Sequence, residues 1–205
     1  MIDVDRNGPI WTVTLNRPKK ANALTAEMLS DLADACAAAT QARALILTGV
    51  GKVFCAGADL DAARAGLATS PDWERLSSAI AGLPGLTIAA LNGTLAGGAM
   101  GMALACDLRI AVPGASFFYP VIKLGYLPQP SDPRRLASLV GPAQAKLILL
   151  AGQKLTADEA LNAGLIDKIV RDHPVMDHAR GLCAAVAAAD PDVAQKIKAM
   201  CPSGW

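Results

Sequence analysis

The stretch "LAGGAMGMALACD", residues 95–107, sets three glycines among small apolar residues and carries no charge before its closing aspartate. No GK[ST] sequence follows it, and Gly98 with Gly101 alone is not a dinucleotide fingerprint, so the stretch does not match a phosphate-binding loop. A helix that begins near Gly97 has backbone N–H groups without partners at its start. Glycine there allows a ligand oxygen to come close to the backbone. The stretch therefore predicts a strand-to-helix turn whose N–H groups suit one polarised oxygen.

A second element of the same kind lies in "GKVFCAGADL", residues 51–60. Small side chains from Cys55 to Ala58 again leave backbone N–H groups accessible. Two such donors from separate turns can converge on one carbonyl oxygen and form an oxyanion hole. Two tight turns in a core of small residues are the alternative. The spacing alone leaves both open.

A membrane helix is the other interpretation of this region, because residues 76–106 carry no charge and are long enough to span a bilayer. Gly93, Gly97 and Gly101 also repeat the small-xxx-small spacing of packed membrane helices. However, Gly and Pro at 82–85 and the Asn92-Gly93 pair interrupt the run. We therefore expect a loop, a short strand and a second element near Gly97, and no membrane association.

Composition favours a single globular domain over residues 1–205, with a core over about 1–170 and C-terminal helices over about 175–200. The chain is 53% hydrophobic and 18% charged, with a net charge of +1. That balance argues against a nucleic-acid or membrane-surface partner. Five scattered cysteines indicate small buried residues in a reducing compartment and no metal site. The first residues do not resemble a secretory signal, so we expect a cytoplasmic protein.

Strand and helix patterns alternate along the chain, which predicts an α/β fold with a largely parallel sheet. The strands are expected at 10–15, 44–49, 86–91, 108–112, 116–119 and 165–170. Thr25 is the expected N-cap of a helix over 26–39. Thr156 and Glu159 form a capping box, with Gly164 as the helix stop. Asp190 and Pro191 start a last helix.

Four segments resemble the crotonase superfamily, the enoyl-CoA hydratase/isomerase family: "LNRPKKANAL", "GVGKVFCAGADL", "LNGTLAGGAMGMALACDLRIA" and "LTADEALNAGLIDKIV". They occur in the family's order from about residue 8 to 200, and FCAGADL is the most specific. The resemblance implies a spiral of repeated ββα units, assembled as a homotrimer or hexamer. It implies an acyl-CoA ligand of fatty-acid metabolism, with coenzyme A as part of the substrate and no separate cofactor.

The resemblance also implies site residues. The oxyanion-hole donors are the N–H groups of Ala58 and Gly98. One such donor contributes about 2.7–4 kcal/mol at a transition state. The coenzyme A portion runs along seven residues: Lys20, Ala21, Ala23, Leu24, Ala56, Asp59 and Leu60.

The family's two catalytic glutamates are absent. Their positions fall on Gly101 and Val121, which are expected to line the substrate site but cannot move a proton. Each acid–base group commonly contributes about 10²–10⁴-fold, so we expect severely reduced hydratase (lyase) activity. The chain is then either an enzyme, which uses another base or a substrate that supplies its own proton acceptor, or a non-catalytic fatty acyl-CoA carrier.

Other polar residues near these motifs have simpler roles. Asp132 is the nearest carboxylate, and we expect it to be the N-cap of a helix that starts at Pro133. Gln129 carries an amide, which is no proton shuttle, and Asp59 is a weak candidate base. The remaining polar rings are expected in the core or on the surface: Tyr119 and Tyr126 as core or rim aromatics, and His173 and His178 as solvated surface residues.

The resemblance implies a shortened C-terminal helical region. Relatives continue for about two more helices after the segment matched by "KIKAMCPSGW". Those helices help to cover the acyl pocket or a neighbouring subunit. We therefore expect a more open pocket, able to admit a long acyl chain.

Overall fold

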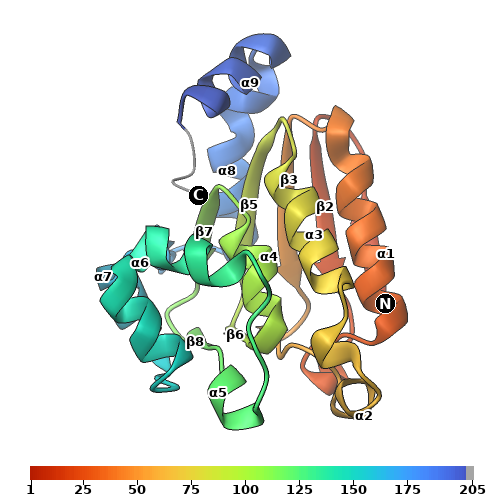
Figure 1. Ribbon diagram of the computed structural model, residues 1–205. Helices are drawn as coiled ribbons and strands as arrows, with labels where there is room; N and C mark the ends of the chain where they lie inside the picture. The colour runs from red at the N-terminus through yellow and green to blue at the C-terminus, as the bar shows by residue number, and fades with distance from the viewer. Residues whose placement is uncertain (202–205) are drawn as a thin grey trace.

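The computed structural model of the protein describes residues 1–201, which fold into two sheets flanked by helices (Figure 1). A six-stranded sheet has the order β1-β2-β3-β5-β7-β10, and a four-stranded sheet has the order β4-β6-β8-β9. The strands of the larger sheet are β1 (Ile2–Asp5), β2 (Ile10–Leu15), β3 (Ala44–Gly49), β5 (Leu86–Leu91), β7 (Leu108–Ala111) and β10 (Lys168–Ile169). The smaller sheet has β4 (Val53–Cys55), β6 (Thr94–Ala96), β8 (Ser116–Phe118) and β9 (Leu155–Thr156).

Nine α-helices lie within the described residues. They are α1 (Ala26–Ala37), α2 (Leu60–Arg64), α3 (Asp72–Ala81), α4 (Met100–Leu104), α5 (Val121–Leu124), α6 (Asp132–Leu149), α7 (Ala157–Asn162), α8 (Val175–Ala188) and α9 (Pro191–Met200). The chain repeats one unit three times, in which a strand of the larger sheet is followed by a strand of the smaller sheet and then by a helix. The strand pairs of the three units are β3 and β4, β5 and β6, and β7 and β8. This repetition is the predicted spiral of ββα units.

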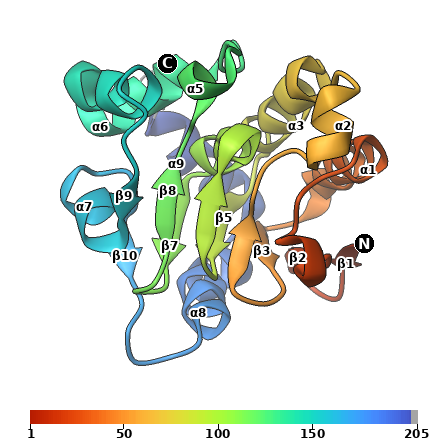
Figure 2. The same cartoon turned by 90° about the horizontal axis from the view of Figure 1, so that it is seen from below.

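Helices cover both faces of the larger sheet, which explains the continuous apolar runs of its central strands. Figure 2 shows α1 and α3 on one side and α8 on the other. On the α8 side, Ile46, Ile88 and Ile110 pack against Ala179 and Cys183. The opposite face belongs to the main core, which continues into the smaller sheet through Phe54 and Phe117. The larger sheet therefore holds the smaller one, and the turns that leave it, in a fixed place.

Most of the predicted elements are confirmed. The expected strands at 10–15, 44–49 and 86–91 have those bounds. The Thr25 cap accepts a hydrogen bond from the Met28 N–H, and the Thr156–Glu159 capping box is complete. The last strand is shorter than expected, since only Lys168–Ile169 pairs. Strand β1 was not predicted; its backbone pairs antiparallel with β2.

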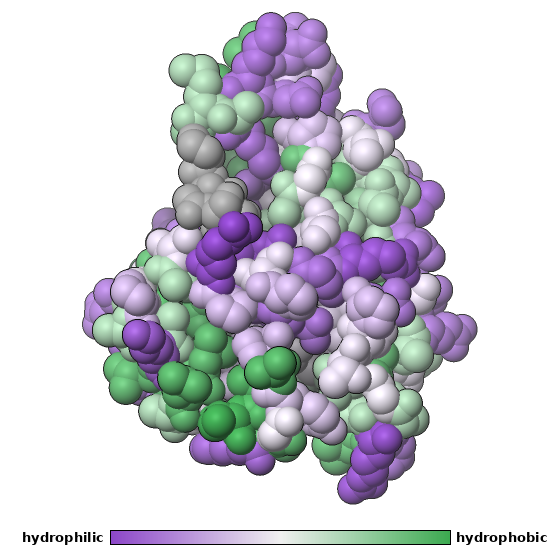
Figure 3. All heavy atoms as spheres, in the orientation of Figure 1, coloured by the Kyte–Doolittle hydropathy of each residue, from purple (hydrophilic) through white to green (hydrophobic). Residues whose placement is uncertain are grey.

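Two surface features stand outside the sheet core. Exposed apolar side chains gather over α5 and the end of α6 (Figure 3): Ile122, Leu124, Leu127, Leu147 and Leu150. A groove of about 900 Å³ runs between α8–α9 and the segments 81–86 and 105–109, which lead into β5 and β7. The ion pair between Lys198 and Asp107 lies at this groove, with 2.7 Å between Nζ and Oδ2. No helix among residues 1–201 is long and apolar enough to cross a membrane.

Candidate functional site

Two strand-to-helix turns meet at the edge of the smaller sheet. Strands β4 and β6 pair in parallel, so the chain leaves both at the same edge. Gly57 (φ +92°) follows β4, and Gly97 (φ +61°) follows β6. A Cβ at Gly57 would lie 3.0 Å from the Ala96 carbonyl oxygen and 3.4 Å from the Gly98 nitrogen. The turns are therefore in backbone contact, which only a residue without a side chain allows at Gly57.

The N–H groups of Ala58 and Gly98 are the free donors of this contact. Within residues 1–201, neither has a hydrogen-bond acceptor, and both residues are half-buried. Gly98 lies in the short 3₁₀ turn Gly97–Ala99 that leads into α4, where N–H groups precede the first intrahelical bonds. The two predicted donors thus lie on adjoining backbones of half-buried residues.

The segment from Ala21 to Leu24 is hydrogen-bonded along the first of these turns. The Ala56 N–H donates to the Ala21 carbonyl, the Leu24 N–H to Gly57, and the Asp59 N–H to Leu24. Backbone from both segments thus forms one side of the site. Of the other residues predicted for the coenzyme A portion, Lys20, Ala56 and Leu60 are exposed at its rim.

Asn22 holds this segment in place, and sequence reasoning did not identify it. It is fully buried with φ +53°; its Oδ1 accepts from the Arg17 N–H, and its Nδ2 donates to Val50 and Val53. Asparagine tolerates this left-handed conformation better than most residues. The sequence signal that could have identified this left-handed position is the asparagine itself, between "KKA" and "ALT".

Asp59 is engaged by the protein itself. Its Oδ2 lies 2.8 Å from Arg17 Nη1, and its Oδ1 accepts from the N–H groups of Asp61 and Ala62 as the cap of α2. The hydrogen bond from Arg17 holds the pKa of Asp59 below its usual range. Its carboxylate is therefore a poor base and shapes the turn that presents Ala58.

An indole ring lies over the second turn. A Cβ at Gly98 would lie 3.1 Å from the Trp73 ring, which is buried and donates from Nε1 to the Leu67 carbonyl. The ring lies on the side of Gly98 where a side chain would otherwise project. Trp73 therefore shields one side of this donor.

Of the positions expected for the two glutamates, Gly101 follows this turn on α4 and Val121 begins α5, and both are buried. A carboxylate from another element occupies the space beside Gly101. A Cβ there would lie 2.8 Å from Asp132 Oδ1 and 3.0 Å from Oδ2. Asp132 is fully buried, its Oδ2 accepts a 2.8 Å hydrogen bond from Tyr119 Oη, and its Oδ1 has no partner within the described residues.

The predicted N-cap role of Asp132 is wrong. Helix α6 begins at Asp132 itself, Ser131 is in the N-cap position, and no side chain caps this end. The first turn is anchored by other bonds: the Asp132 N–H donates to the Gln129 carbonyl, and the Gln129 N–H donates to Tyr119 Oη. The Tyr119 hydroxyl therefore draws the Asp132 carboxylate away from the helix end and toward α4.

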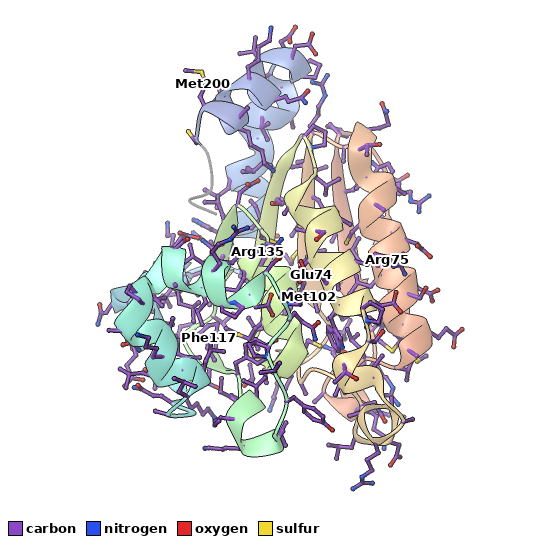
Figure 4. The ribbon with its side chains drawn as sticks, in the orientation of Figure 1. Glu74, Arg75, Met102, Phe117, Arg135 and Met200 are labelled. Atoms are coloured by element: carbon purple, nitrogen blue, oxygen red, sulfur yellow. The ribbon has the colours of Figure 1, made fainter. Side chains whose placement is uncertain are left out.

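Burial raises the pKa of Asp132 to about 7, although the Tyr119 hydroxyl and Arg135 oppose the shift. Glu74 on α3 adds to it by repulsion. Glu74 itself accepts hydrogen bonds from the N–H and hydroxyl of Ser131, which tie α3 to the start of α6. Figure 4 labels Glu74 on α3, Met102 on α4 and Arg135 on α6, and α4 contacts both of the other helices.

The other candidate groups lie elsewhere. Tyr119 is a core aromatic and Tyr126 a partly exposed one, both within expectation. His173 is exposed, but His178 is half-buried with its Nε2 enclosed, so its predicted solvated position is wrong. Four cysteines are buried as expected, whereas Cys201 is exposed. No metal-binding cluster of His, Cys, Asp and Glu occurs in residues 1–201.

The chain is similar in sequence and in fold to known proteins that act on CoA thioesters by name. A short-chain-enoyl-CoA hydratase from Clostridium acetobutylicum is 33% identical over 207 residues, 95% of this chain and 77% of that protein. A carnitinyl-CoA dehydratase from Salmonella arizonae is 37% identical over 203 residues, 94% of this chain and 77% of that one. The crystal structure of an enoyl-CoA hydratase from Bacillus anthracis superimposes with a TM-score of 0.86 at 32% identity, covering 95% and 79% of the two chains.

These relatives share the crotonase type of α/β spiral. The family model for enoyl-CoA hydratase/isomerase matches residues 5–203. The chain belongs to the enoyl-CoA hydratase/isomerase family.

Proposed function

We propose that this protein binds acyl-CoA thioesters of fatty-acid metabolism and holds the thioester carbonyl oxygen between the N–H groups of Ala58 and Gly98. The contact between the Gly57 and Gly98 backbones is the observation that carries the proposal. It brings two unpartnered donors together, and two donors on one oxygen stabilise the negative charge of a thioester enolate.

The surroundings of these donors fit the rest of such a ligand. The Ala21–Leu24 and Ala56–Asp59 segments are joined by backbone hydrogen bonds, so a flexible pantetheine chain meets a rigid surface. Lys20 is exposed at the rim and can approach the phosphates of coenzyme A. Coenzyme A enters as part of the ligand, and the proposal needs no metal or separate cofactor.

Ordinary hydratase activity is not part of the proposal, because Gly101 and Val121 carry no proton-transfer group. The same observation favours the alternative function, a carrier that holds fatty acyl-CoA without converting it. A carrier binds saturated and unsaturated acyl-CoA comparably and turns over neither. An enzyme changes at least one of them.

Calorimetric titration of the protein with free coenzyme A, butyryl-CoA, octanoyl-CoA and palmitoyl-CoA tests the binding. We expect every acyl-CoA to bind more tightly than coenzyme A, and equal or absent binding contradicts the proposal. Gly98→Ala forces a methyl group against the Trp73 ring and is expected to weaken acyl-CoA binding. Gly114→Ala is the matched control, because its Cβ meets nothing within 4 Å.

Hydration of crotonyl-CoA on the same preparation tests the missing acid–base pair. We expect turnover far below about 10 s⁻¹, a typical enzyme rate. Turnover near that rate contradicts the inference that Gly101 and Val121 disable hydration.

We also propose a cytoplasmic homotrimer or hexamer. The exposed apolar side chains over α5 and the end of α6 support self-association. Light scattering of the purified protein gives its mass, and a monomer contradicts this assembly.

A further inference from the structure

We propose that Trp73 on α3 is the positioning residue of the Gly98 N–H, because its indole ring fixes the direction in which this donor points. The inference rests on the proposed function, since the direction of the donor matters only if a thioester oxygen binds there. It deepens that function by naming the side chain on which the strength of the donor depends.

The turn that carries Gly98 does not fix its own conformation. Gly97 and Gly98 are consecutive glycines, and glycine has a wider range of backbone conformations than any other residue. Gly97 has φ +61°, and no side chain caps the start of α4 that follows. The Gly98 N–H has no acceptor within residues 1–201. Contacts from outside the turn therefore hold the direction of this N–H.

The turn after β4 and the ring of Trp73 both supply such contacts. A Cβ at Gly97 would lie 3.6 Å from the Ala56 carbonyl oxygen. The three atoms nearest to a Cβ at Gly98 all belong to the Trp73 ring: Cδ2 and Cε2 at 3.1 Å and Cε3 at 3.3 Å. Ordinary carbon–carbon contacts are about 3.5–4.0 Å long. The indole ring therefore lies directly against the Gly98 backbone, where only a glycine fits.

The position of the ring is set by bonds that do not involve Gly98. The indole Nε1 donates to the Leu67 carbonyl oxygen over 2.8 Å, and the whole side chain is buried. A buried indole whose N–H has its acceptor is fixed in orientation as well as in place. Leu67 is itself buried, in the 3₁₀ turn Leu67–Thr69 that precedes α3.

The residues that follow Trp73 anchor the helix that carries it. Glu74 accepts hydrogen bonds from the N–H and hydroxyl of Ser131 at the start of α6. Arg75 donates to Asp34 on α1, with 2.6 Å between Nη1 and Oδ1. Figure 4 labels Glu74 and Arg75 on α3. Bonds to two other helices thus fix the first turn of α3 and, with it, the ring.

A fixed direction matters because a hydrogen bond weakens steeply when its angle falls below about 120°. A donor that already points at the carbonyl oxygen needs no reorganisation when negative charge develops there. The Gly98 N–H is present whatever side chains surround it, and the ring sets where it points. Loss of the ring contact is therefore expected to weaken the hold on the thioester and to leave the coenzyme A portion bound as before.

The first test is Trp73→Phe, which keeps a buried aromatic ring but removes the Nε1 donor and the fused ring atoms that contact Gly98. Calorimetry measures binding of butyryl-CoA and of free coenzyme A. We expect the dissociation constant of butyryl-CoA to rise about fivefold or more, as for the loss of one hydrogen bond, and that of coenzyme A to stay within about twofold. Trp11→Phe, the same change at a partly buried tryptophan of β2, is the matched control and is expected to equal wild type.

The carbonyl stretching frequency of bound butyryl-CoA, labelled with ¹³C at the thioester carbonyl, separates positioning from general packing. A loss of stability alone does not alter the hydrogen bonds of the ligand that remains bound. We expect the downward shift of this frequency on binding to be smaller in Trp73→Phe than in wild type and unchanged in Trp11→Phe.

A cycle of single and double variants tests the contact itself. In the wild-type background, Gly98→Ala forces its methyl group against the ring, whereas the smaller ring of Trp73→Phe leaves room for it. We expect Gly98→Ala to weaken butyryl-CoA binding about tenfold or more in wild type and less than about threefold in Trp73→Phe, because substitutions at residues in contact are not additive. Equal effects in the two backgrounds would overturn the proposal.

Circular dichroism and urea denaturation verify that each variant folds. If Trp73→Phe does not fold, Trp73→Met takes its place, because methionine fills irregular core space but presents no rigid ring. The same changes in binding and in carbonyl frequency are expected.

The outcomes separate the proposed function from the role of Trp73. Failure of the wild type to bind acyl-CoA overturns the proposed function and this inference with it. A carbonyl shift that is seen in wild type and persists unaltered in Trp73→Phe overturns the role of Trp73 alone. A loss of affinity that is equal for coenzyme A and butyryl-CoA also overturns it, because the effect would then be a general one on the fold.

Discussion

The site has two halves that are built in different ways. The donor half, at Ala58 and Gly98, consists of backbone held by two turns in contact. The carboxylate half is formed by Gly101 on α4 and by the Asp132 carboxylate, which α6 places beside it. Backbone donors are fixed by the fold and persist when side chains change, whereas a carboxylate can be supplied from whichever element faces the same space. The positions of the Ala58 and Gly98 N–H groups are thus set by the backbone, whereas the carboxylate beside Gly101 comes from a different helix.

The strongest way to break the donor half is Gly93→Ala. A Cβ at this position would overlap the Lys52 carbonyl group, and both residues belong to backbone that leads into β4 and β6. We expect a loss of more than about 4 kcal/mol in the free energy of unfolding, measured by urea denaturation. Gly114→Ala is the control. A loss below about 1 kcal/mol in Gly93→Ala, the ordinary effect of a point mutation, would show that the backbones at Gly93 and Lys52 are not in close contact.

The carboxylate half is tested by the stability of Asp132→Asn at two pH values. The folded-state pKa of Asp132 is raised to about 7 from an ordinary value of 3.8, so the folded state binds this proton more tightly than the unfolded state. Its contribution to stability is full below about pH 4 and is lost as pH rises through 7. The neutral amide avoids this loss, since a tenfold difference in proton affinity between the two states corresponds to about 1.4 kcal/mol.

We therefore expect Asp132→Asn to be more stable than wild type by up to about 4 kcal/mol at pH 8 and nearly equal to it at pH 4. Thermal unfolding at both pH values measures the difference. Equal stability of wild type and Asp132→Asn at pH 8 would mean that the Asp132 carboxylate is not desolvated. Asp158→Asn, at an exposed position, is expected to show no such pH dependence.

Asn22→Ala tests whether the first turn depends on a side chain after all. The change removes the acceptor of the Arg17 N–H and the side-chain donor to the Val50 carbonyl, and it takes one of two amide donors from the Val53 carbonyl, which keeps Asn92. We expect a loss of about 2–3 kcal/mol in stability and weaker acyl-CoA binding, because the Ala21–Leu24 segment loosens. Calorimetry and urea denaturation measure the two effects, and unaltered binding would separate this segment from the site.

The smallest expected effect lies outside both halves. Gly181 is an exposed residue within α8, and a Cβ there would meet nothing within 4 Å. Gly181→Ala is expected to raise the free energy of unfolding by about 0.5–1 kcal/mol and to leave acyl-CoA binding unchanged. A shift in binding would show that α8 is coupled to the site.

The two strand-to-helix turns could be predicted from the sequence, because glycines and small residues follow short apolar strands there, whereas the choice of Ala58 and Gly98 as donors came from the family resemblance. The apolar runs of β3 and β5 and the Thr156 cap were equally local signals. The cap predicted at Asp132 was wrong for a physical reason. An aspartate before a proline matches a helix cap locally, but Tyr119, thirteen residues earlier, donates to its carboxylate and Gly101 makes room for it. Such contacts between distant segments leave no local pattern, and the same holds for Asn22.

The carbonyl stretching frequency of bound butyryl-CoA, labelled with ¹³C at the thioester carbonyl, tests the central claim most directly. Hydrogen bonds from the N–H groups of Ala58 and Gly98 weaken the carbonyl double bond. We therefore predict a shift to lower frequency in the infrared difference spectrum on binding, reduced in Gly98→Ala and preserved in Gly114→Ala and Asp132→Asn. A bound thioester whose carbonyl frequency equals that in water, or a shift insensitive to Gly98→Ala, would contradict the claim.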